Sequence, residues 1–569
     1  MKKIRHILIL LTIYLLALGV RVYWLSQKDG LHVDEGLSIA YANYNDYIVR
    51  KNYEYGKRYT GKELKEASLV SSTEIKDLFD DVRNLRKDNR DSPHTNLYYT
   101  FLRLSFAGIK TGDISTIILR GGILNLLFFT VSFIFFFLLM RLLFADSKFL
   151  QYTAVFCAFL STAAVSNTLF LRPYQIQEMI FIIFCYYFTL SLGWKKYFIH
   201  ERRLFIGVLK PILIMSLITA LTFLTGYYAV FMVGLFGLYA LYLQCKNKTF
   251  SEIPFYFAVL LLGLIFTRIL YPKYFSGFLS YRGQETIKTI SDNIIANIQV
   301  SITAAGTLLE KHFFSYPVIA VCILCLAYQA VPLIRGQKIS GIVQKLKNRT
   351  LCANTPVQKT AWYIFTSSLL YLLIVLIIAP YKVLRYGMPV FPFFIILPAM
   401  LVDSIRTHSR KIAGCAMLLL CGCFALNAAR ESKIENIFRN KPDEYVFTKD
   451  KDTPVYVINA GWSAWKYANL IPYVNDEQAY YFIDWFDYLG EYFRTGQKNT
   501  NIHLPEIEDY NSIYLLSEYI PEFAQLDEFI TDIVQTTNGS VESEFEINTG
   551  EPETWYAYFK GKKIIIDEP

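Results

Sequence analysis

The sequence predicts an α-helical polytopic membrane protein with about eleven transmembrane helices and a C-terminal soluble domain of the α/β or α+β class. Two observations carry this prediction. Of the 569 residues, 53% are hydrophobic and 18% are charged, whereas a soluble domain carries about 25% charged residues. The apolar residues also gather in long blocks, and a helix needs about 20 of them to span a bilayer. This composition excludes a soluble enzyme, a fibrous protein and a disordered protein.

Eleven segments have apolar runs long enough to form transmembrane helices. They are residues 6–25, 120–143, 149–169, 173–193, 204–224, 227–245, 253–271, 313–334, 360–379, 387–402 and 411–429. The connections that follow the even-numbered segments are rich in Lys and Arg, as in 195–203 and 335–349. Because such residues gather on the cytoplasmic side, we expect a cytoplasmic N-terminus and an extracytoplasmic C-terminal domain. The first segment lacks a cleavage site and is predicted to be an uncleaved anchor.

Two domains are predicted. Residues 1–430 form a transmembrane domain with two outward-facing loops, 26–119 with amphipathic helices and 272–312. Residues 431–569 form a separate extracytoplasmic domain, since this length is enough for a core of its own. Strand-like runs at 454–460, 511–520, 540–547 and 554–560 alternate there with a helical stretch at 462–471.

The charge distribution agrees with this division. Residues 431–569 hold 11 Lys and Arg against 26 Asp and Glu, a balance of −15, and the rest of the chain has a balance of +24. The net charge of +9 is therefore not a basic patch for nucleic acid. Much of the basic excess lies in the loops that set the orientation, and the expected partner is the lipid bilayer.

The first candidate motif follows the first transmembrane segment, where Asp34 and Glu35 are adjacent. Acidic residues favour the first turn of a helix, so a capping role is one interpretation. The alternative is a general base at the mouth of a cavity in the membrane domain. Because neighbouring side chains on a helix point in different directions, only one of the two is expected to face a substrate.

The second and third motifs contain further charged residues. Asp91 and His94 precede an aromatic amphipathic stretch, and either belong to a solvated loop or face the same cavity. Arg172, Tyr174 and Glu178 lie where the third segment turns into the fourth. The planar guanidinium of an arginine matches phosphate oxygens. An ionisable residue within a spanning helix indicates function, although Glu178 is shallow enough for an interfacial position.

The last two motifs are also predicted to face outward. Lys382, Arg385 and Tyr386 lie between the ninth and tenth segments. In a helix Lys382 and Arg385 would share a face and suit a phosphate, with interfacial snorkelling as the alternative. Tyr227 lies between the fifth and sixth segments, where an aromatic belt is the alternative to a substrate contact.

These five motifs, in this order, resemble those of the GT-C glycosyltransferases, within them the protein-mannosyltransferase and aminoarabinose-transferase-like group. The similar stretches are Asp34-Glu35, DSPHTNLYY (91–99), LRPYQIQE (171–178), TGYYAVF (225–231) and RYGMPVFP (385–392). The resemblance covers roughly residues 1–430. Gly226 replaces a family histidine, so no role of that histidine carries over to this chain.

The resemblance implies a GT-C-like catalytic domain that transfers a sugar, with inversion, from a polyprenyl-phosphate-linked donor to a hydroxyl acceptor. The acceptor would be a glycolipid, a polysaccharide or a protein on the outer face of the cytoplasmic membrane. Asp34 would be the catalytic base, with Glu35 secondary. The implied substrate-binding residues are Asp91, His94, Arg172, Tyr174, Glu178, Tyr227, Lys382, Arg385 and Tyr386.

No cofactor is certain. Some members of this group use a divalent metal ion, for which Asp34, Asp91 or His94 are the candidate ligands. Two other functions stay open: an O-antigen ligase or polymerase-like envelope enzyme, and a membrane transporter. A transporter would carry ionisable residues near the bilayer midplane and paired broken helices in two similar halves, and the sequence shows neither.

Overall fold

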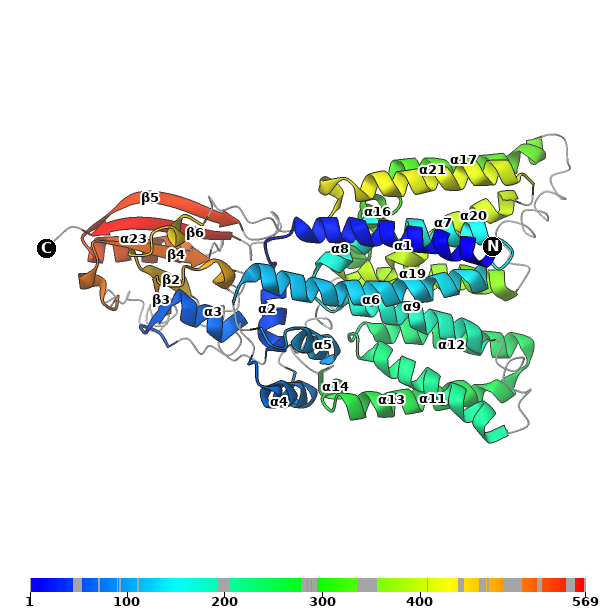
Figure 1. The fold of residues 1–569 in the computed structure, drawn as a ribbon, viewed down its shortest axis with the longest axis horizontal. Coiled ribbons are helices and arrows are strands. Elements are labelled where there is room, and N and C mark those ends of the chain that lie inside the picture. The colour runs from blue at the N-terminus through cyan, green and yellow to red at the C-terminus, as the bar shows by residue number, and fades with distance from the viewer. Residues whose placement is uncertain are drawn as a thin grey trace. The chain divides into compact units, whose positions relative to one another are not determined.

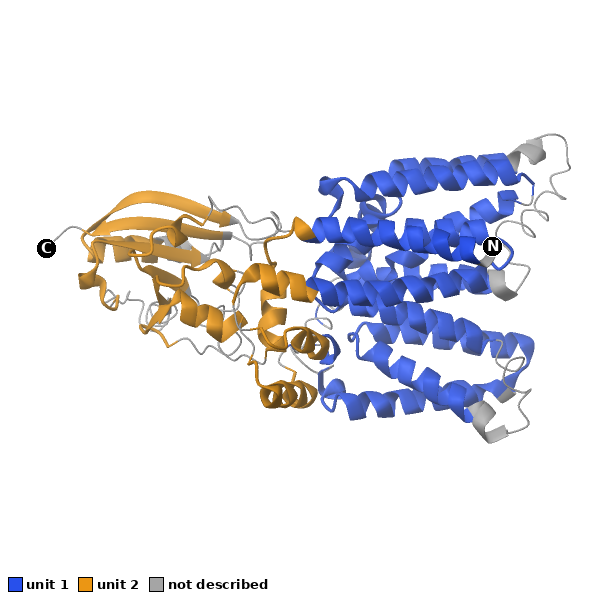
Figure 2. Cartoon of the chain, viewed as in Figure 1, with its two compact units in different colours: residues 1–25, 91–98, 122–435 blue, residues 26–90, 99–121, 436–569 orange. Residues whose placement is uncertain are grey.

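The fold is given by a computed structural model. It describes residues 2–43, 54–69, 72–89, 91, 94–109, 112–192, 204–277, 284, 288, 294–334, 356–406, 408–437, 445–459, 467, 470–484, 504–518, 524–548 and 558–566. The chain forms two compact units, and both cross the domain boundary expected from the sequence (Figure 2). Unit 1 comprises residues 1–25, 91–98 and 122–435, and unit 2 comprises 26–90, 99–121 and 436–569.

Unit 1 is a bundle of helices, several of them side by side along most of their length (Figure 1). Its helices are α1 (Lys2–Ser26), α6 (Ile114–Leu143), α7 (Lys148–Phe159), α8 (Thr162–Leu169), α9 (Tyr174–Ser191), α11 (Leu204–Phe223), α12 (Ala229–Asn247), α13 (Ile253–Leu270), α14 (Tyr274–Gly277), α16 (Ile294–His312), α17 (Tyr316–Ile334), α19 (Pro356–Ile378), α20 (Ile396–Arg406) and α21 (Arg410–Ala428). Short 3-10 helices are η1 (Phe250–Glu252), η2 (Leu384–Tyr386), η3 (Met388–Ile395) and η4 (Glu431–Lys433). Every predicted transmembrane segment overlaps one of these helices or a consecutive pair.

The membrane character of the bundle is confirmed. Among the described residues, seven helices are long and apolar enough to cross a bilayer, or up to nine if each of two bent pairs counts as one span. The two remaining predicted segments are α9, whose first turns contain Gln175, Gln177 and Glu178, and α11, whose described apolar part is the shorter stretch Leu209–Phe223. The protein is a multi-pass helical membrane protein.

One helix lies where a loop was expected. Residues 294–312 were assigned to the outward-facing loop 272–312, but they form α16, which is bent by 93° relative to α17. Two of its polar side chains form hydrogen bonds with the C-terminal turn of α19. Asn297 donates to the Ile377 carbonyl, and buried Ser301 donates to the Leu376 carbonyl. The mixture of apolar and polar residues in α16 reflects this packing on a neighbouring helix, which local hydropathy does not report.

The interior of unit 1 accounts for the high aromatic content. One hydrophobic cluster of buried residues runs through most of the helices and is rich in phenylalanine. Aromatic pairs recur within it: the rings of Tyr239 and Tyr363 stack with centroids 3.7 Å apart, and Phe159 contacts Phe129, Phe133 and Phe136 edge-on or tilted. Such pairs stabilise beyond their buried area, which favours one packing of helices whose outer surfaces are uniformly apolar.

Unit 2 is built on a six-stranded mixed sheet in the order β1-β3-β2-β4-β6-β5. The strands are β1 (Arg58–Thr60), β2 (Val455–Asn459), β3 (Ala479–Asp484), β4 (Ser512–Glu518), β5 (Gly539–Asn548) and β6 (Tyr558–Ile566). Strand β2 pairs in parallel with β3 and β4, and the outer pairs are antiparallel. The soluble domain with both strands and helices is therefore confirmed.

Helices accompany this sheet within unit 2. They are α2 (Val33–Ala42), α3 (Gly61–Leu69), α4 (Ile75–Lys87), most of α5 (Leu97–Ser105) and α23 (Ala524–Thr536), with 3-10 turns η6 (Val446–Thr448), η8 (Ile471–Tyr473) and η9 (Ile507–Asp509). Helix α23 covers one face of the sheet, where Phe529, Ile530 and Ile533 pack on Tyr456 and Ile513. The predicted helical stretch 462–471 lies mostly outside the described residues.

The first outward-facing segment contributes to the same sheet. Strand β1 pairs with β3, with Tyr59 opposite Tyr480, and α3 follows directly. At the junction, a Cβ on Gly61 would lie 1.9 Å from the Asn475 carbonyl oxygen, so only glycine allows this approach. Residues 26–90 thus pack with the C-terminal segment as one unit, although residues 91–435 lie between them in the chain.

Candidate functional site

Three residues of the second and third motifs meet in unit 1. Arg172 donates from one terminal nitrogen to Asp91 Oδ2 at 3.2 Å, and its other terminal nitrogen lies 3.3 Å from His94 Nδ1. His94 Nδ1 and Asp91 Oδ2 are themselves 2.9 Å apart. The side chains of Asp91 and Arg172 are 7% and 6% exposed. Asp91 therefore fixes the direction of the guanidinium in a nearly dry environment, where such charge-assisted bonds are strong.

The turn that carries Arg172 is held by its surroundings. Helix α8 ends at Leu169, and the amide of Asn125 on α6 donates to the carbonyls of Thr168 at 3.1 Å and Phe170 at 2.9 Å. These bonds satisfy carbonyls that the end of a helix leaves without partners. Pro173 then opens α9, a position where the missing N–H costs nothing.

Aromatic residues from three motifs adjoin the charged cluster. The ring of His94 meets Tyr174 edge-on at 6.4 Å, and Tyr174 meets Tyr386 at 6.4 Å. Tyr386 in turn contacts Tyr228 edge-on at 5.9 Å, and the Arg385 guanidinium lies 5.7 Å from the Tyr386 ring centre. Tyr174 of α9, Tyr386 of η2 and Tyr228 of the turn before α12 thus form a row of rings that starts at His94, and we call this row the aromatic wall.

The turn before α12 approaches the same cluster from another direction. Thr95 donates a hydrogen bond to the Leu224 carbonyl, which ties the second motif to this turn. Burial, together with the nearby negative charge of Asp91, raises the pKa of Tyr227 to about 12, so its hydroxyl stays protonated. The Tyr227 ring packs against Tyr274 with centroids 5.3 Å apart. Four of the five motifs therefore converge within unit 1.

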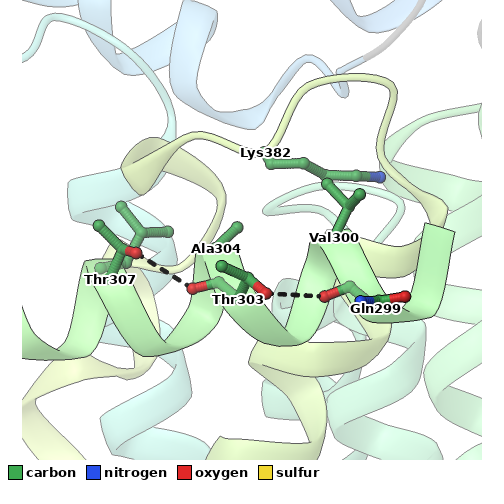
Figure 3. A pocket seen from close by; sticks show the side chains of 7 residues that line it. Gln299, Val300, Thr303, Ala304, Thr307 and Lys382 are labelled. Carbon is green, nitrogen blue, oxygen red and sulfur yellow. Dashed lines mark hydrogen bonds between the residues drawn. The ribbon is translucent and has the colours of Figure 1, made fainter. Parts of the chain in front are cut away.

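Lys382 has different neighbours from Arg385. Helix α19 ends at Ile378 and only Leu384–Tyr386 form a 3-10 turn, so the condition for a common helical face of Lys382 and Arg385 is not met. The Lys382 ammonium donates to the Ala379 carbonyl at 2.8 Å, as cations do at helix C-termini. It lies beside a cavity of about 450 Å³ along α16 (Figure 3). The lining residues are Gln299, Val300, Thr303, Ala304, Thr307, Leu308 and Lys382.

Asp34 and Glu35 belong to unit 2 and have distinct environments. Glu35 completes a capping box on α2, since its Oε2 accepts the His32 backbone N–H at 2.8 Å. The same oxygen pairs with Lys28 at 3.0 Å, and both side chains are fully buried. The Asp34 side chain is 22% exposed, with Oδ2 3.8 Å from His32 Nδ1. The capping interpretation therefore accounts for Glu35, and Asp34 keeps the more accessible carboxylate.

Glu178 lies inside the bundle and forms hydrogen bonds with protein groups. Its Oε1 accepts from Gln175 at 3.0 Å and its Oε2 from Asn167 at 3.1 Å. The charge of buried Arg21 on α1 acts on Glu178. Arg21 itself donates to Thr168 Oγ1 and to the carbonyls of Phe159 and Ala164. Arg21 was not among the predicted residues, although a single cation inside the first apolar segment is the kind of signal that indicates a role.

Broken helices, which the sequence did not reveal, occur in the bundle. Helices α7 and α8 are bent by 52° at their junction, and α16 and α17 form the second bent pair. At the first break, Arg21 donates to the Phe159 carbonyl at 2.8 Å and the Ala164 carbonyl at 3.1 Å. The Phe159 carbonyl at the end of α7 is therefore bound by a protein cation, and polar backbone groups at helix breaks inside membranes need such partners.

The neighbours of the three candidate metal ligands decide whether these residues fit a metal ion. Of Asp34, Asp91 and His94, the structure brings Asp91 and His94 together, and Arg172 contacts both. A guanidinium at this position repels a divalent cation, so this pair does not fit a metal site. Within the described part of the chain, no group of three or more His, Cys, Asp and Glu residues is arranged to hold a metal.

A second ionic cluster lies at the end of unit 1. Glu435 pairs with Lys311 and with His312 at 2.9 Å each, and its backbone N–H donates to Ser166 Oγ at 2.8 Å. Burial alone would raise the pKa of Glu435, but hydrogen bonds and charges from His312 and Lys311 outweigh burial and hold that pKa at about 2. Nothing in the local sequence indicated this cluster, because Glu435 is more than 120 residues from Lys311 and His312.

This cluster predicts an acid-sensitive contribution to stability. A carboxyl whose pKa is lower in the folded than in the unfolded chain stabilises the fold above its unfolded pKa and loses that effect as the pH falls. Between its ordinary value of 4.5 and about 2, Glu435 should lose roughly 3 kcal/mol of stabilisation. Thermal unfolding of the wild type and Glu435→Gln should therefore differ clearly near pH 5 and converge towards pH 2. An equal difference in melting temperature between the two proteins at both pH values would contradict this prediction.

Similarity to known proteins is found at the level of solved structures. No protein-family model and no curated protein matches this chain. Among solved structures, it is similar to ArnT from Cupriavidus metallidurans bound to undecaprenyl phosphate, with a TM-score of 0.45 and 9% identity, and to the same protein in the apo state, with a TM-score of 0.43 and 10% identity. Each match covers 97% of both chains. Similarity at this level does not by itself establish a shared activity.

Proposed function

We propose that this protein is a membrane glycosyltransferase of the GT-C type that uses a polyprenyl-phosphate-linked sugar. In this proposal the sugar passes, with inversion, to a hydroxyl of a glycolipid, polysaccharide or protein at the outer face of the cytoplasmic membrane. The observation that carries the proposal is the convergence of separate motifs on one cluster. Asp91 and His94 contact the Arg172 guanidinium, Tyr174 lies against His94, and Tyr386 lies against Tyr174, although these stretches are up to about 290 residues apart in sequence.

The chemistry of this arrangement suits a phosphate leaving group. The acceptor oxygen forms a bond to the anomeric carbon while the bond from that carbon to the phosphate oxygen breaks. The electron pair stays on the phosphate, and a base takes the hydroxyl proton. Transition states of this kind need positive charge placed in advance where negative charge develops. Arg172, oriented by Asp91, supplies such a charge, and Arg385 next to Tyr386 supplies a second.

The aromatic wall suits the sugar. Flat rings of Tyr174, Tyr228 and Tyr386 offer apolar faces together with hydroxyl groups, which is how amphipathic aromatic side chains contribute to binding sites. We propose Asp34 as the base, since its carboxylate is partly exposed while that of Glu35 is committed to Lys28 and the helix cap. Lys382 is proposed to contribute a more distant positive charge beside the α16 cavity.

A direct transfer assay tests the function. Purified protein in lipid nanodiscs is mixed with radiolabelled hexosyl- or pentosyl-undecaprenyl phosphate and with envelope fractions as acceptors. We expect label to move from the lipid phase into one acceptor fraction, with release of undecaprenyl phosphate and an anomeric configuration opposite to that of the donor. Wild-type protein that binds the donor but transfers no sugar to any fraction would contradict the proposal.

A transporter is the second candidate, because the described residues contain two bent helix pairs and buried charged groups. Two positions weigh against it. Arg21 lies five residues before the end of α1 and Glu178 one turn into α9, so both are near helix ends, about 6–8 Å along the axis. Arg21 also binds the carbonyls at the first break. Flux of lipid-linked sugar into proteoliposomes without sugar transfer would favour the transporter.

A further inference from the structure

A continuous chain of buried hydrogen bonds connects α1 with the turn that carries Arg172. Arg21 Nε donates to Thr168 Oγ1 at 2.9 Å, and Thr168 Oγ1 donates to Gln175 Oε1 at 2.8 Å. Gln175 Nε2 donates to Glu178 Oε1 at 3.0 Å, and Glu178 Oε2 accepts from Asn167 Nδ2 at 3.1 Å. We call Arg21, Thr168, Gln175, Glu178 and Asn167 the polar network. Glu178 accepts two of its hydrogen bonds, and the other four side chains each donate at least one.

The polar network is fully enclosed by protein. All five side chains are buried, with exposures of 1% or less. The Arg21 guanidinium also lies 3.9 Å above the ring of Phe129, and three backbone carbonyls, those of Ala17, Phe159 and Ala164, accept from it. Ionised groups are expensive to bury unless every one of them is satisfied. A polar network so close to the candidate site therefore points to a role that apolar packing would not fulfil.

The network ends on both sides of Arg172. Asn167 Nδ2 also donates to the Tyr174 carbonyl at 3.3 Å, and Asn125 donates to the carbonyls of Thr168 and Phe170. The rings of Phe170 and Tyr174 are parallel, with centroids 6.0 Å apart. The segment from residue 168 to 174 is thus held before and after Arg172 by the side chains of Asn125 and Asn167.

We propose that Arg21 and Thr168 are positioning residues that hold the Arg172 guanidinium in the geometry needed at a lipid-linked phosphate. This inference rests on the proposed function, because it gives Arg172 a phosphate to bind. Thr168 is the central link, since its single hydroxyl accepts from Arg21 and donates to Gln175. Without it, the α8–α9 turn loses its connection to α1, and Arg172 is free to shift relative to Asp91 and the substrate.

A matched pair of variants at Thr168 tests the proposal. Thr168→Val keeps the shape and removes the hydroxyl, whereas Thr168→Ser keeps the hydroxyl. A misplacement of about 1 Å costs roughly 100-fold in rate, so we expect kcat for transfer from glycosyl-undecaprenyl phosphate to fall about 10- to 100-fold in Thr168→Val. KM should change little, since Arg172 acts mainly on charge that develops in the transition state. Thr168→Ser should be close to wild type.

A control on the next helix separates positioning from general destabilisation. Thr189 lies on α9, and its hydroxyl donates to the Cys185 carbonyl of the same helix at 2.7 Å, outside the polar network. Thr189→Val should keep wild-type kcat and KM. Thermal unfolding of all three variants shows whether a loss of kcat follows a loss of stability. A kcat of Thr168→Val that equals that of Thr189→Val would overturn the positioning role.

A binding measurement keeps the two proposals apart. Undecaprenyl phosphate should raise the melting temperature of wild type and Thr168→Ser more than that of Thr168→Val. If wild type transfers sugar and Thr168→Val matches it in kcat and in this shift, only the positioning role fails. If wild type neither binds undecaprenyl phosphate nor transfers sugar, the proposed function fails and the positioning role fails with it.

Discussion

Replacing Arg172 with alanine is expected to lower the rate of sugar transfer from glycosyl-undecaprenyl phosphate by about 100- to 1,000-fold, the usual cost of removing one preorganised electrostatic donor. Arg172 is the residue on which Asp91 and His94 converge, at 3.2 and 3.3 Å. Its loss removes the positive charge at the leaving phosphate and also leaves Asp91 without its buried partner. The rate constant is measured by single-turnover transfer with the donor in excess over its KM.

Two companion variants make this result specific. Arg172→Lys keeps the charge but not the planar fork, so it should recover only part of the activity. Arg406→Ala removes an arginine that also pairs with an aspartate, Asp403 at 2.8 Å, but at the end of α20 and outside the cluster. It should keep wild-type activity. Wild-type transfer by correctly folded Arg172→Ala would show that the leaving group is stabilised elsewhere.

Separate consequences are expected for the adjacent acids Asp34 and Glu35. Asp34→Asn should lower transfer by about 100- to 10,000-fold, the range for loss of a general base, with little change in stability because its side chain is partly exposed. Glu35→Gln should instead destabilise the fold by about 3 kcal/mol, because it leaves a buried ammonium group without its partner. The measurements are transfer rate and thermal unfolding for each variant.

The environment of Lys28 explains the second outcome. Burial lowers the pKa of Lys28, and the charge and hydrogen bond of Glu35 oppose that effect. The ammonium also donates to the Asn436 carbonyl at 2.8 Å, so Glu35 links the segment after α1 to the start of the C-terminal segment. Lys28→Met with Glu35→Gln should recover part of the lost stability. A stable Glu35→Gln variant that has lost sugar transfer would instead indicate that Glu35 is the base.

The candidate site illustrates what a sequence can indicate. Asp91, His94, Arg172, Tyr174 and Tyr386 were each selected because their residue types suit phosphate and sugar chemistry, and the structure brings these five together. Their convergence could be expected from the predicted topology, since all belong to loops on one side of the bundle. The pairing of Arg172 with Asp91 could not be expected, because no local sequence pattern indicates which cation pairs with a given acid.

Other features needed the three-dimensional arrangement. Lys382 and Arg385 would have shared a face if one helix held both, but α19 ends before Lys382 and Arg385 lies in a separate 3-10 turn. Glu178 had been assigned to the substrate, and its hydrogen bonds lead instead to Gln175, Asn167 and, through Thr168, to Arg21. The sheet of unit 2 joins β1, near the start of the chain, to strands after residue 454.

The sequence by itself determined the approximate limits of most apolar helices, the division of charge between the membrane segment and the acidic C-terminal segment, and the residue types of the site. These properties follow from local composition, because the free energy of placing a segment in a bilayer depends on that segment alone. Only the tertiary structure decided that Glu35 caps α2, that Arg21 supports the turn of Arg172, and that residues 26–90 pack with the C-terminal sheet. Ion pairs, shared sheets and buried hydrogen bonds join residues far apart in the chain, and their free energy depends on which neighbours packing brings within reach.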